Sequence, residues 1–212
     1  MMPHMKDPGS RLENTVNLAG FIARSTVNGP GTRAVIWVQG CPIRCEGCFN
    51  TNFRSFTPKN QVPVGQLAER IGVLKNIDGV TFSGGEPFAQ AGGLGRLGEL
   101  VQDSGLSVVT YTGFTYDHIL QKKRSAWQHL LSVTDLLISG PYVPSLDCRR
   151  TLIGSSNQKI IPLTNRIDFI PTESRSTSGD IELIVSRRGN VTATGFPGNH
   201  FVRHLTYRCN GG

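Results

Sequence analysis

The sequence has 212 residues, enough for one domain with its own hydrophobic core. Hydrophobic residues make up 38% and charged residues 17%, proportions that exclude a disordered chain. The formal net charge is +7, but Arg and Lys cluster only in short runs such as residues 122–124. Because no aromatic residues interleave with these runs, nucleic-acid binding is not expected.

No apolar run reaches the length needed to cross a bilayer, and the first ten residues lack the apolar core of a secretory signal. We expect residues 1–14 to be a disordered N-terminus or a cloning remnant. Three of the five cysteines fall between residues 41 and 48, which makes a poor disulfide framework. A cytoplasmic protein with free or metal-bound thiols is therefore predicted.

Short apolar segments alternate with helix-compatible segments along the next part of the chain. Strands are predicted over residues 15–26, 33–39, 79–82, 106–112, 136–139 and 159–161, and helices over residues 64–74, 94–104 and 116–132. About five of these strands are apolar enough to be buried on both faces, which predicts parallel βαβ units. Because this number is too small for an eight-stranded barrel, we expect an α/β fold with a partial, open parallel β/α barrel.

The character of the sequence changes after Leu163. Residues 164–179 are polar and contain Pro171, as expected of a linker or a long loop. Residues 181–185 and 191–194 flank an Arg-Gly-Asn turn and predict a β-hairpin. We therefore expect a core domain over residues 15–163 and a C-terminal extension over residues 164–212.

Cys41, Cys45 and Cys48 follow a predicted strand with the spacing C-x3-C-x2-C. A 4Fe–4S cluster is usually bound by four thiolates, so three cysteines in one loop leave one iron open. The amino and carboxylate groups of S-adenosylmethionine (SAM) would suit this open position. A reduced cluster could then pass one electron to the sulfonium, giving methionine and a 5′-deoxyadenosyl radical.

Two other interpretations of the cysteines stay open. A zinc site would need a fourth ligand, and neither Cys148 nor Cys209 belongs to a second paired motif. Three unligated thiols close together by chance are the other possibility. We expect Cys148 to be an ordinary semi-buried thiol and Cys209 to be a tail residue.

Four stretches carry a resemblance to a known family: residues 28–33 (NGPGTR), 41–50 (CPIRCEGCFN), 83–87 (SGGEP) and 154–158 (GSSNQ). The cysteine loop and the Gly-Gly-Glu sequence resemble the radical SAM superfamily. The GSSNQ stretch resembles the branch that activates anaerobic ribonucleoside-triphosphate reductase. The resemblance covers roughly residues 15–163.

The resemblance implies which residues contact the cofactor. Ser83 ends a strand, and the following Gly84, Gly85 and Glu86 are expected to contact the amino group of SAM, although such a sequence alone is more often a simple βα turn. The other cofactor-binding candidates lie near the cysteine loop or at strand ends: Phe49, Asn50, Thr110, Thr112, Asn157 and Gln158. The two threonines could equally be half-buried strand residues. Arg33 is expected either to steady the cysteine loop or to be a surface residue.

The resemblance also implies an activity. Reductase activators abstract a hydrogen atom from a backbone glycine of a partner enzyme, which then stores a glycyl radical. A flavodoxin-type or ferredoxin-type protein is the expected reductant. Since this chain continues about fifty residues beyond Leu163, two alternatives stay open: a radical SAM enzyme acting directly on a small molecule, nucleotide or peptide, and a non-catalytic zinc- or cluster-binding module.

Overall fold

The computed structural model describes residues 14–169, 181–185, 189 and 191–196. The expectations for residues 1–13, for most of the polar segment after Phe169 and for Cys209 lie outside the described residues. Within the described part of the chain, no helix is both long enough and apolar enough to span a bilayer.

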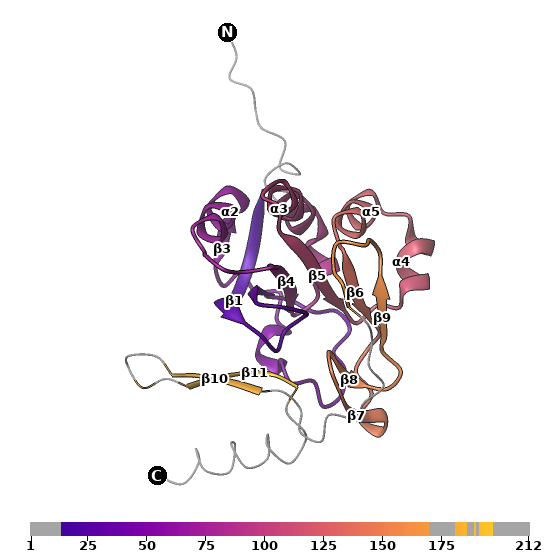
Figure 1. Ribbon diagram of the computed structural model, residues 1–212. Helices are drawn as coiled ribbons and strands as arrows, with labels where there is room; N and C mark the ends of the chain where they lie inside the picture. Colours follow the sequence, from indigo (N-terminus) through magenta and orange to yellow (C-terminus); the bar gives the residue numbers. More distant parts are fainter. Residues whose placement is uncertain (1–13, 170–180, 186–188, 190, 197–212) are drawn as a thin grey trace.

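A mixed seven-stranded sheet forms the centre of the molecule (Figure 1), in the order β3-β1-β2-β4-β5-β6-β9. Its strands are β1 (Thr15–Ser25), β2 (Arg33–Val38), β3 (Gln61–Pro63), β4 (Gly79–Gly84), β5 (Ser107–Thr112), β6 (Leu136–Ser139) and β9 (Lys159–Pro162). Strands β2, β4, β5 and β6 are mutually parallel, and β1, β3 and β9 pair antiparallel at the two sides. The expected α/β fold with an open, parallel core is confirmed.

Residues 159–161 form a strand, as predicted, but it is not one of the parallel strands. Strand β9 runs antiparallel to β6, with Leu136 opposite Pro162 and Ser139 opposite Lys159. The segment between them holds only the short helix η3 (Pro144–Leu146) and the strands β7 (Asp147–Arg150) and β8 (Ile153–Ser155). A strand parallel to β6 would require a crossover connection, usually through an α-helix. Because this segment contains no such helix, the chain turns back and β9 pairs antiparallel with β6.

The helices are α2 (Val64–Gly72), α3 (Ala91–Asp103), α4 (Tyr116–Lys122) and α5 (Ser125–Ser132), with short 3₁₀ segments η1 (Thr51–Phe53) and η2 (Pro87–Gln90). The expectation of one helix over residues 116–132 is wrong. Lys123 adopts a left-handed conformation with φ of 46°, and Arg124 is extended. A left-handed residue commonly ends a helix, but Gly or Asn usually occupies that position, so no local residue type marks this break.

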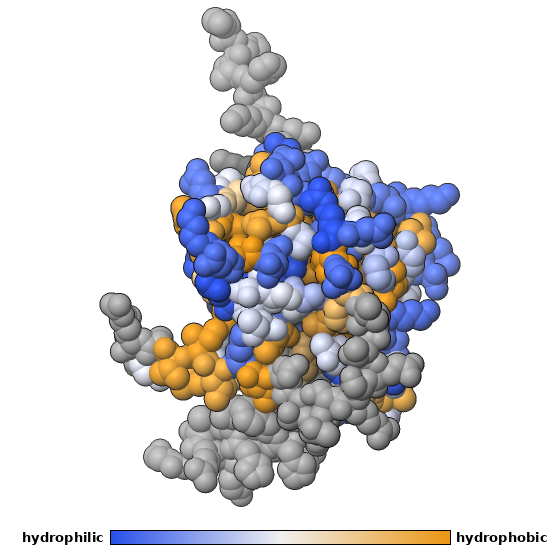
Figure 2. Space-filling view, viewed as in Figure 1, coloured by the Kyte–Doolittle hydropathy of each residue, from blue (hydrophilic) through white to orange (hydrophobic). Residues whose placement is uncertain are grey.

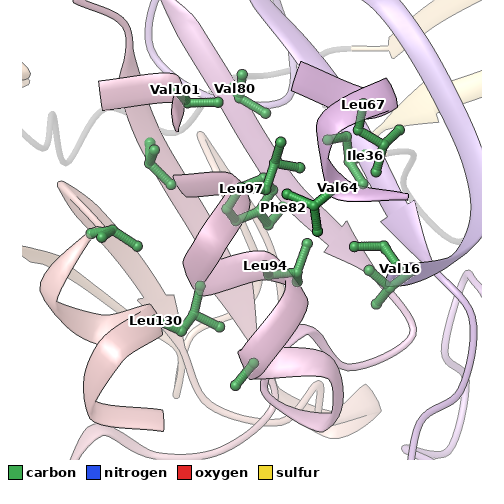
Figure 3. Packing of buried hydrophobic residues seen from close by; sticks show 14 of the residues in the cluster. Val16, Ile36, Val64, Leu67, Val80, Phe82, Leu94, Leu97, Val101 and Leu130 are labelled. Carbon is green, nitrogen blue, oxygen red and sulfur yellow. The ribbon is translucent and has the colours of Figure 1, made fainter. Parts of the chain in front are cut away.

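The main hydrophobic core lies between the sheet and the helices that cover one of its faces (Figure 3). Leu67 of α2, Leu94 and Leu97 of α3, and Leu130 of α5 pack with Phe82 of β4, and all five are fully buried. Burying side chains of this size contributes about 1.5–3 kcal/mol each. This packing fixes the parallel strands, and hence the positions of the loops at their ends.

A smaller cluster covers part of the opposite sheet face. Val109 and Ile138 from the sheet pack with Leu152 and Ile153, and Phe196 joins the edge of the cluster. Both faces of the central strands are therefore covered, and the polar loops at the strand ends remain as the place for a site.

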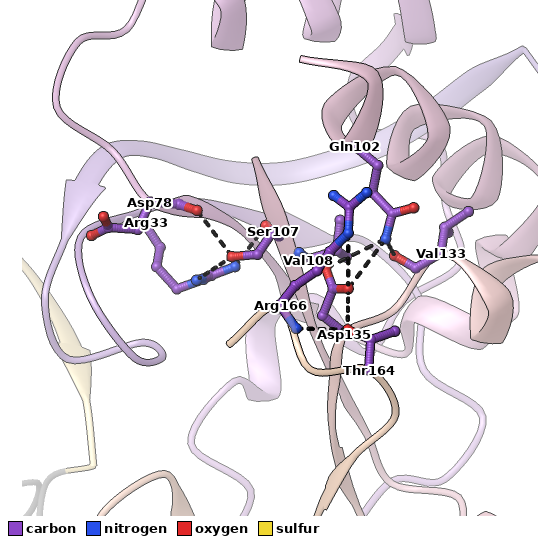
Figure 4. A network of polar contacts seen from close by, with 9 residues as sticks. All are labelled: Arg33, Asp78, Gln102, Ser107, Val108, Val133, Asp135, Thr164 and Arg166. Carbon is purple, nitrogen blue, oxygen red and sulfur yellow. Dashed lines mark hydrogen bonds and ion pairs between the residues drawn. The ribbon is translucent and has the colours of Figure 1, made fainter. Parts of the chain in front are cut away.

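Arg33 begins β2, only 1% of its surface is exposed, and it belongs to a buried polar network (Figure 4). Its Nε donates to Oγ1 of Thr81 at 3.0 Å, and its Nη2 donates to the backbone oxygen of Ser107 at 2.7 Å. Burial lowers its pKa to about 10, since leaving water penalises the charged form. Arg33 is thus neither a surface residue nor a support of the cysteine loop, because these bonds lie at the start of β2 and the loop leaves its end.

The expected hairpin is confirmed as β10 (Ile181–Val185) paired antiparallel with β11 (Val191–Gly195). Oε1 of Glu182 accepts from the backbone N–H of Thr26 at 2.8 Å, and Nδ2 of Asn28 donates to Oγ1 of Thr194 at 2.9 Å. These bonds hold the hairpin on the loop that leads into β2. Figure 2 shows apolar surface over the hairpin, where its exposed hydrophobic residues are Leu183, Ile184, Val185 and Val191.

Candidate active site

The carboxyl ends of the four parallel strands converge on one cavity. The cysteine loop leaves β2, residues 84–86 leave β4, residues 112–113 leave β5, and residues 140–142 leave β6. The ends of parallel strands are the usual location of sites in open α/β sheets. The cavity measures about 130 Å³ and is lined by Cys41, Ile43, Arg44, Cys45, Cys48, Arg54, Ser83, Gly84, Gly85, Glu86, Tyr111, Thr112, Gly113, Gly140, Tyr142 and Gln158.

All three cysteines of the loop line this cavity as half-buried free thiols. The loop can bend around it because Arg44 and Gly47 take left-handed conformations, with φ of 53° and 66°. Cys148, which belongs to β7, is a half-buried thiol that is not among the residues lining the cavity, as expected.

Burial raises the pKa of the Cys41 and Cys45 thiols, because the low-dielectric surroundings penalise the thiolate. Backbone N–H groups act in the opposite direction: those of Arg44 and Ile43 bond Cys41, and that of Tyr142 bonds Cys45. Such N–H groups also stabilise metal-bound thiolates. Among the residues that the structure describes, no three His, Cys, Asp or Glu side chains are grouped to hold a single metal ion.

The loop after β4 lies directly against the cysteine loop. Gly84 has φ of 106°, and a Cβ there would lie 2.5 Å from the backbone nitrogen of Val38. A Cβ on Gly85 would lie 2.3 Å from the backbone oxygen of Gly40. Both positions therefore require glycine to let this loop approach the end of β2, and the neighbours that fill the space are protein backbone.

Glu86 is buried and accepts three hydrogen bonds. Its Oε1 accepts from the backbone N–H of Phe88 at 2.9 Å and from Oγ1 of Thr112 at 2.8 Å, and its Oε2 accepts from the N–H of Gly113 at 2.9 Å. Burial raises its pKa to about 7, although the three bonds favour the charged form. The bond to Phe88 caps η2, whose first residue is Pro87.

The two candidate threonines of β5 have different surroundings. Thr112 is the last residue of the strand and lines the cavity beside Glu86. Thr110 lies deeper, where its hydroxyl is 2.8 Å from that of Thr134, and it does not line the cavity. The structure therefore places only Thr112 next to the cysteines.

The candidates from the GSSNQ stretch support the loop after β6. Nε2 of Gln158 donates to the backbone oxygen of Gly140 at 3.0 Å, and its Oε1 accepts from the N–H of Gly154 at 2.8 Å. Nδ2 of Asn157 donates to the backbone oxygen of Pro141 at 2.8 Å. Gln158 lines the cavity and Asn157 does not.

The two candidates that follow Cys48 also differ. Nδ2 of Asn50 donates to the backbone oxygen of Gly84 at 3.4 Å, which connects the cysteine loop to the loop after β4. Phe49 is 47% exposed and is not among the residues lining the cavity. For every candidate, a role in binding SAM stays a prediction.

Arg54 is a cavity residue that the sequence analysis missed. Its Nη2 donates to the backbone oxygen of Cys45, and its Nε is buried without a hydrogen-bond partner among the described residues. Nothing in the local sequence distinguishes Arg54, because only the tertiary structure brings it close to the cysteines. With three thiols and N–H groups directed at two of the sulfurs, this unpaired cationic donor suits an anionic, sulfur-bound group such as an iron–sulfur cluster.

Comparisons with known proteins identify the chemistry. A family model described as a 4Fe–4S single cluster domain matches residues 27–161. The chain is 30% identical over 142 residues to the anaerobic ribonucleoside-triphosphate reductase-activating protein of Enterobacteria phage T4, covering 63% of this chain and 86% of that protein. It is 31% identical over 159 residues to the protein of the same name from Vibrio cholerae serotype O1, covering 68% and 97%.

Two further similarities are weaker. The pyruvate formate-lyase-activating enzyme of Staphylococcus aureus is 27% identical over 148 residues, covering 67% of this chain and 59% of that enzyme. A crystal structure of QueE from Escherichia coli aligns with a TM-score of 0.36 and 18% identity, covering 53% of this chain and 59% of that one. The chain belongs to the radical SAM family of 4Fe–4S single cluster domains, and it is an enzyme whose cofactors are a 4Fe–4S cluster and SAM.

Proposed function

We propose that this enzyme generates a 5′-deoxyadenosyl radical and uses it to abstract a hydrogen atom from a backbone glycine of a partner enzyme. The observation that carries the proposal is the cavity at the ends of four parallel strands, which brings all three cysteines together with the loops after β4, β5 and β6. When bound, the cluster supplies one electron to the sulfonium of SAM, whose C–S bond breaks to give methionine and the radical.

The residues that line the cavity divide between the two cofactors. We assign Cys41, Cys45 and Cys48 as the iron ligands, which leaves one iron open for the methionine end of SAM. The backbone of residues 83–85 and the carboxylate of Glu86 are assigned to the amino group, since a cation there would favour the charged form of this buried carboxyl.

The remaining cavity candidates are assigned to the rest of SAM. Thr112 and Gln158 are proposed to hold its carboxylate or ribose, and Asn50 to position the cysteine loop through Gly84. Thr110, Asn157 and Phe49 do not line the cavity, so a contribution from them would act through the residues that do.

The proposed partner is a glycyl-radical enzyme, supported by the similarity of this chain to the reductase-activating and lyase-activating proteins. A flavodoxin-type or ferredoxin-type protein is the proposed electron donor, and the cytoplasm is the proposed location. We further propose that residues 15–163 are the catalytic core and that residues 164–212 are an extension. The hairpin contacts support this division because they are made with the loop that leads into β2, whereas the cysteine loop leaves the other end of that strand.

The decisive experiment is anaerobic incubation of the iron-loaded protein with SAM, dithionite and a candidate glycyl-radical enzyme. A glycyl doublet in the electron paramagnetic resonance spectrum, absent with a Cys45→Ala variant, would support activation. If 5′-deoxyadenosine forms only with a free metabolite and no glycyl radical appears, the enzyme acts directly on a small molecule and the proposal fails.

A further inference from the structure

Arg54 is hydrogen-bonded to the backbones of two of the three cysteines. Its backbone oxygen accepts a hydrogen bond from the N–H of Cys41 at 3.1 Å, and its guanidinium Nη2 donates to the backbone oxygen of Cys45. The residue directly follows η1, so this short helix fixes where its backbone lies. The residue also lines the cavity that holds the three cysteines.

One donor of this guanidinium has no acceptor. The Nε of Arg54 is buried and unpartnered, and none of the ion pairs found in the described part of the chain includes Arg54. Glu86 lines the same cavity, but its carboxylate is bonded to Phe88, Thr112 and Gly113. A buried donor without a partner costs about 1–3 kcal/mol, and more when it is charged. The missing acceptor is therefore expected to belong to a group that binds in the cavity.

We propose that Arg54 donates a hydrogen bond from Nε to a sulfur of the cluster and that its fixed positive charge raises the reduction potential of the cluster. Cluster potentials depend on hydrogen bonds to the sulfurs and on nearby charge. Reduction adds one negative charge, which a neighbouring cation stabilises, so the reduced form gains more from Arg54 than the oxidised form. The electron comes from an external one-electron donor, and no bond of the protein forms or breaks in this step.

A SAM carboxylate would also accept a hydrogen bond from this Nε. The cluster is favoured because the same guanidinium is already held on the backbone of Cys45, which places it with the cysteine loop. The proposal rests on the cluster chemistry of the family and is independent of whether the substrate is a glycine. Measurement without SAM separates the two acceptors.

The test compares Arg54→Met with the wild-type enzyme, both iron-loaded and without SAM, by redox titration followed by electron paramagnetic resonance. We expect iron content to be retained and the ratio of reduced to oxidised cluster at a fixed potential to fall about tenfold, equivalent to about 59 mV for one electron. Arg54→Lys, which keeps the charge and loses Nε–H, should recover part of this loss. Arg24→Met is the matched control, because it removes the same charge from an exposed side chain of β1 that does not line the cavity, and it should change the ratio less than about twofold.

Four results would overturn the proposal. An unchanged ratio in Arg54→Met would show that the side chain does not tune the cluster, and an equal change in Arg24→Met would show that only the net charge of the protein matters. Loss of iron from both Arg54→Met and Arg54→Lys would show that Arg54 only supports the structure of the cysteine loop. Weaker binding of SAM with an unchanged ratio would assign Nε to the SAM carboxylate.

Discussion

Oε1 of Glu86 and Oγ1 of Thr112 are joined by a 2.8 Å hydrogen bond between residues 26 positions apart. The bond connects the loop after β4 to the last residue of β5, and Gly113 adds a second link to the same carboxylate. The two loops that form this wall of the cavity are therefore held together by one buried carboxyl group. Both the protonation state of Glu86 and its hydrogen bond with Thr112 can be tested by substitution.

Substituting Glu86 should change how stability depends on pH. The carboxyl of Glu86 has a pKa of about 7 in the folded protein, whereas its ordinary value in the unfolded chain is 4.5. Between these two pH values the folded state therefore binds more protons than the unfolded state. The free energy of unfolding should therefore fall as pH rises through this range, by up to about 3 kcal/mol from this group. In Glu86→Gln this pH-dependent contribution to the free energy of unfolding should be absent.

Anaerobic urea unfolding of the wild type and of Glu86→Gln, at about pH 5 and about pH 8, measures the difference. We expect the variant to lose more stability relative to the wild type at the lower pH. The same loss at both pH values would contradict the raised pKa of Glu86.

Thr112→Val and Thr110→Val should have different effects. The first removes a donor to Glu86 at the cavity wall, and we expect it to weaken SAM binding about tenfold. The second breaks the buried bond to Thr134, and we expect it to cost about 1 kcal/mol of stability with little change in SAM affinity. Calorimetric titration with SAM measures the affinity of each variant, and equal weakening of SAM binding in the two variants would show that Thr110 also contributes to cofactor binding.

Gly84→Ala should destabilise the fold by more than about 2 kcal/mol, because alanine is strained at φ of 106° and its Cβ would meet the backbone of Trp37 and Val38. Gly65→Ala is the matched control. It lies in α2 with open space around the added Cβ, and it should raise stability by up to about 1 kcal/mol. Thermal unfolding of the two variants gives the comparison, and a neutral Gly84→Ala would mean that the loop can move away from β2.

Cys45→Ala should abolish cluster loading, because it removes one of three proposed iron ligands. Cys148→Ala removes a half-buried thiol that does not line the cavity and should keep the iron. Iron analysis and absorbance after anaerobic reconstitution distinguish them. A full iron content in Cys45→Ala would refute the assignment of this ligand.

The cysteine spacing and the Gly-Gly-Glu sequence identified the cofactor loop and its neighbour, because both are local signals that lie directly after buried strands. Residues 33–38, 79–84 and 107–112 were predicted as strands close to their observed bounds, because runs of β-branched and apolar residues are typical of strands buried on both faces. The strand β9 was predicted but its antiparallel direction was not, since the direction of a strand depends on the connection before it. The break at Lys123 was missed for a similar reason, as no Gly or Pro marks it.

By itself the sequence determined the class of fold, the three thiols and the identity of the strand-end loops, because these follow from short-range patterns of apolar, glycine and cysteine residues. Only the tertiary structure decided which polar side chains share the cavity. It placed Arg54 against Cys45, used the carboxylate of Glu86 to join two strands, and separated Thr110 from Thr112. Hydrogen-bond partners depend on which strands become neighbours, and that choice is made by packing of the helices and sheet rather than by spacing along the chain.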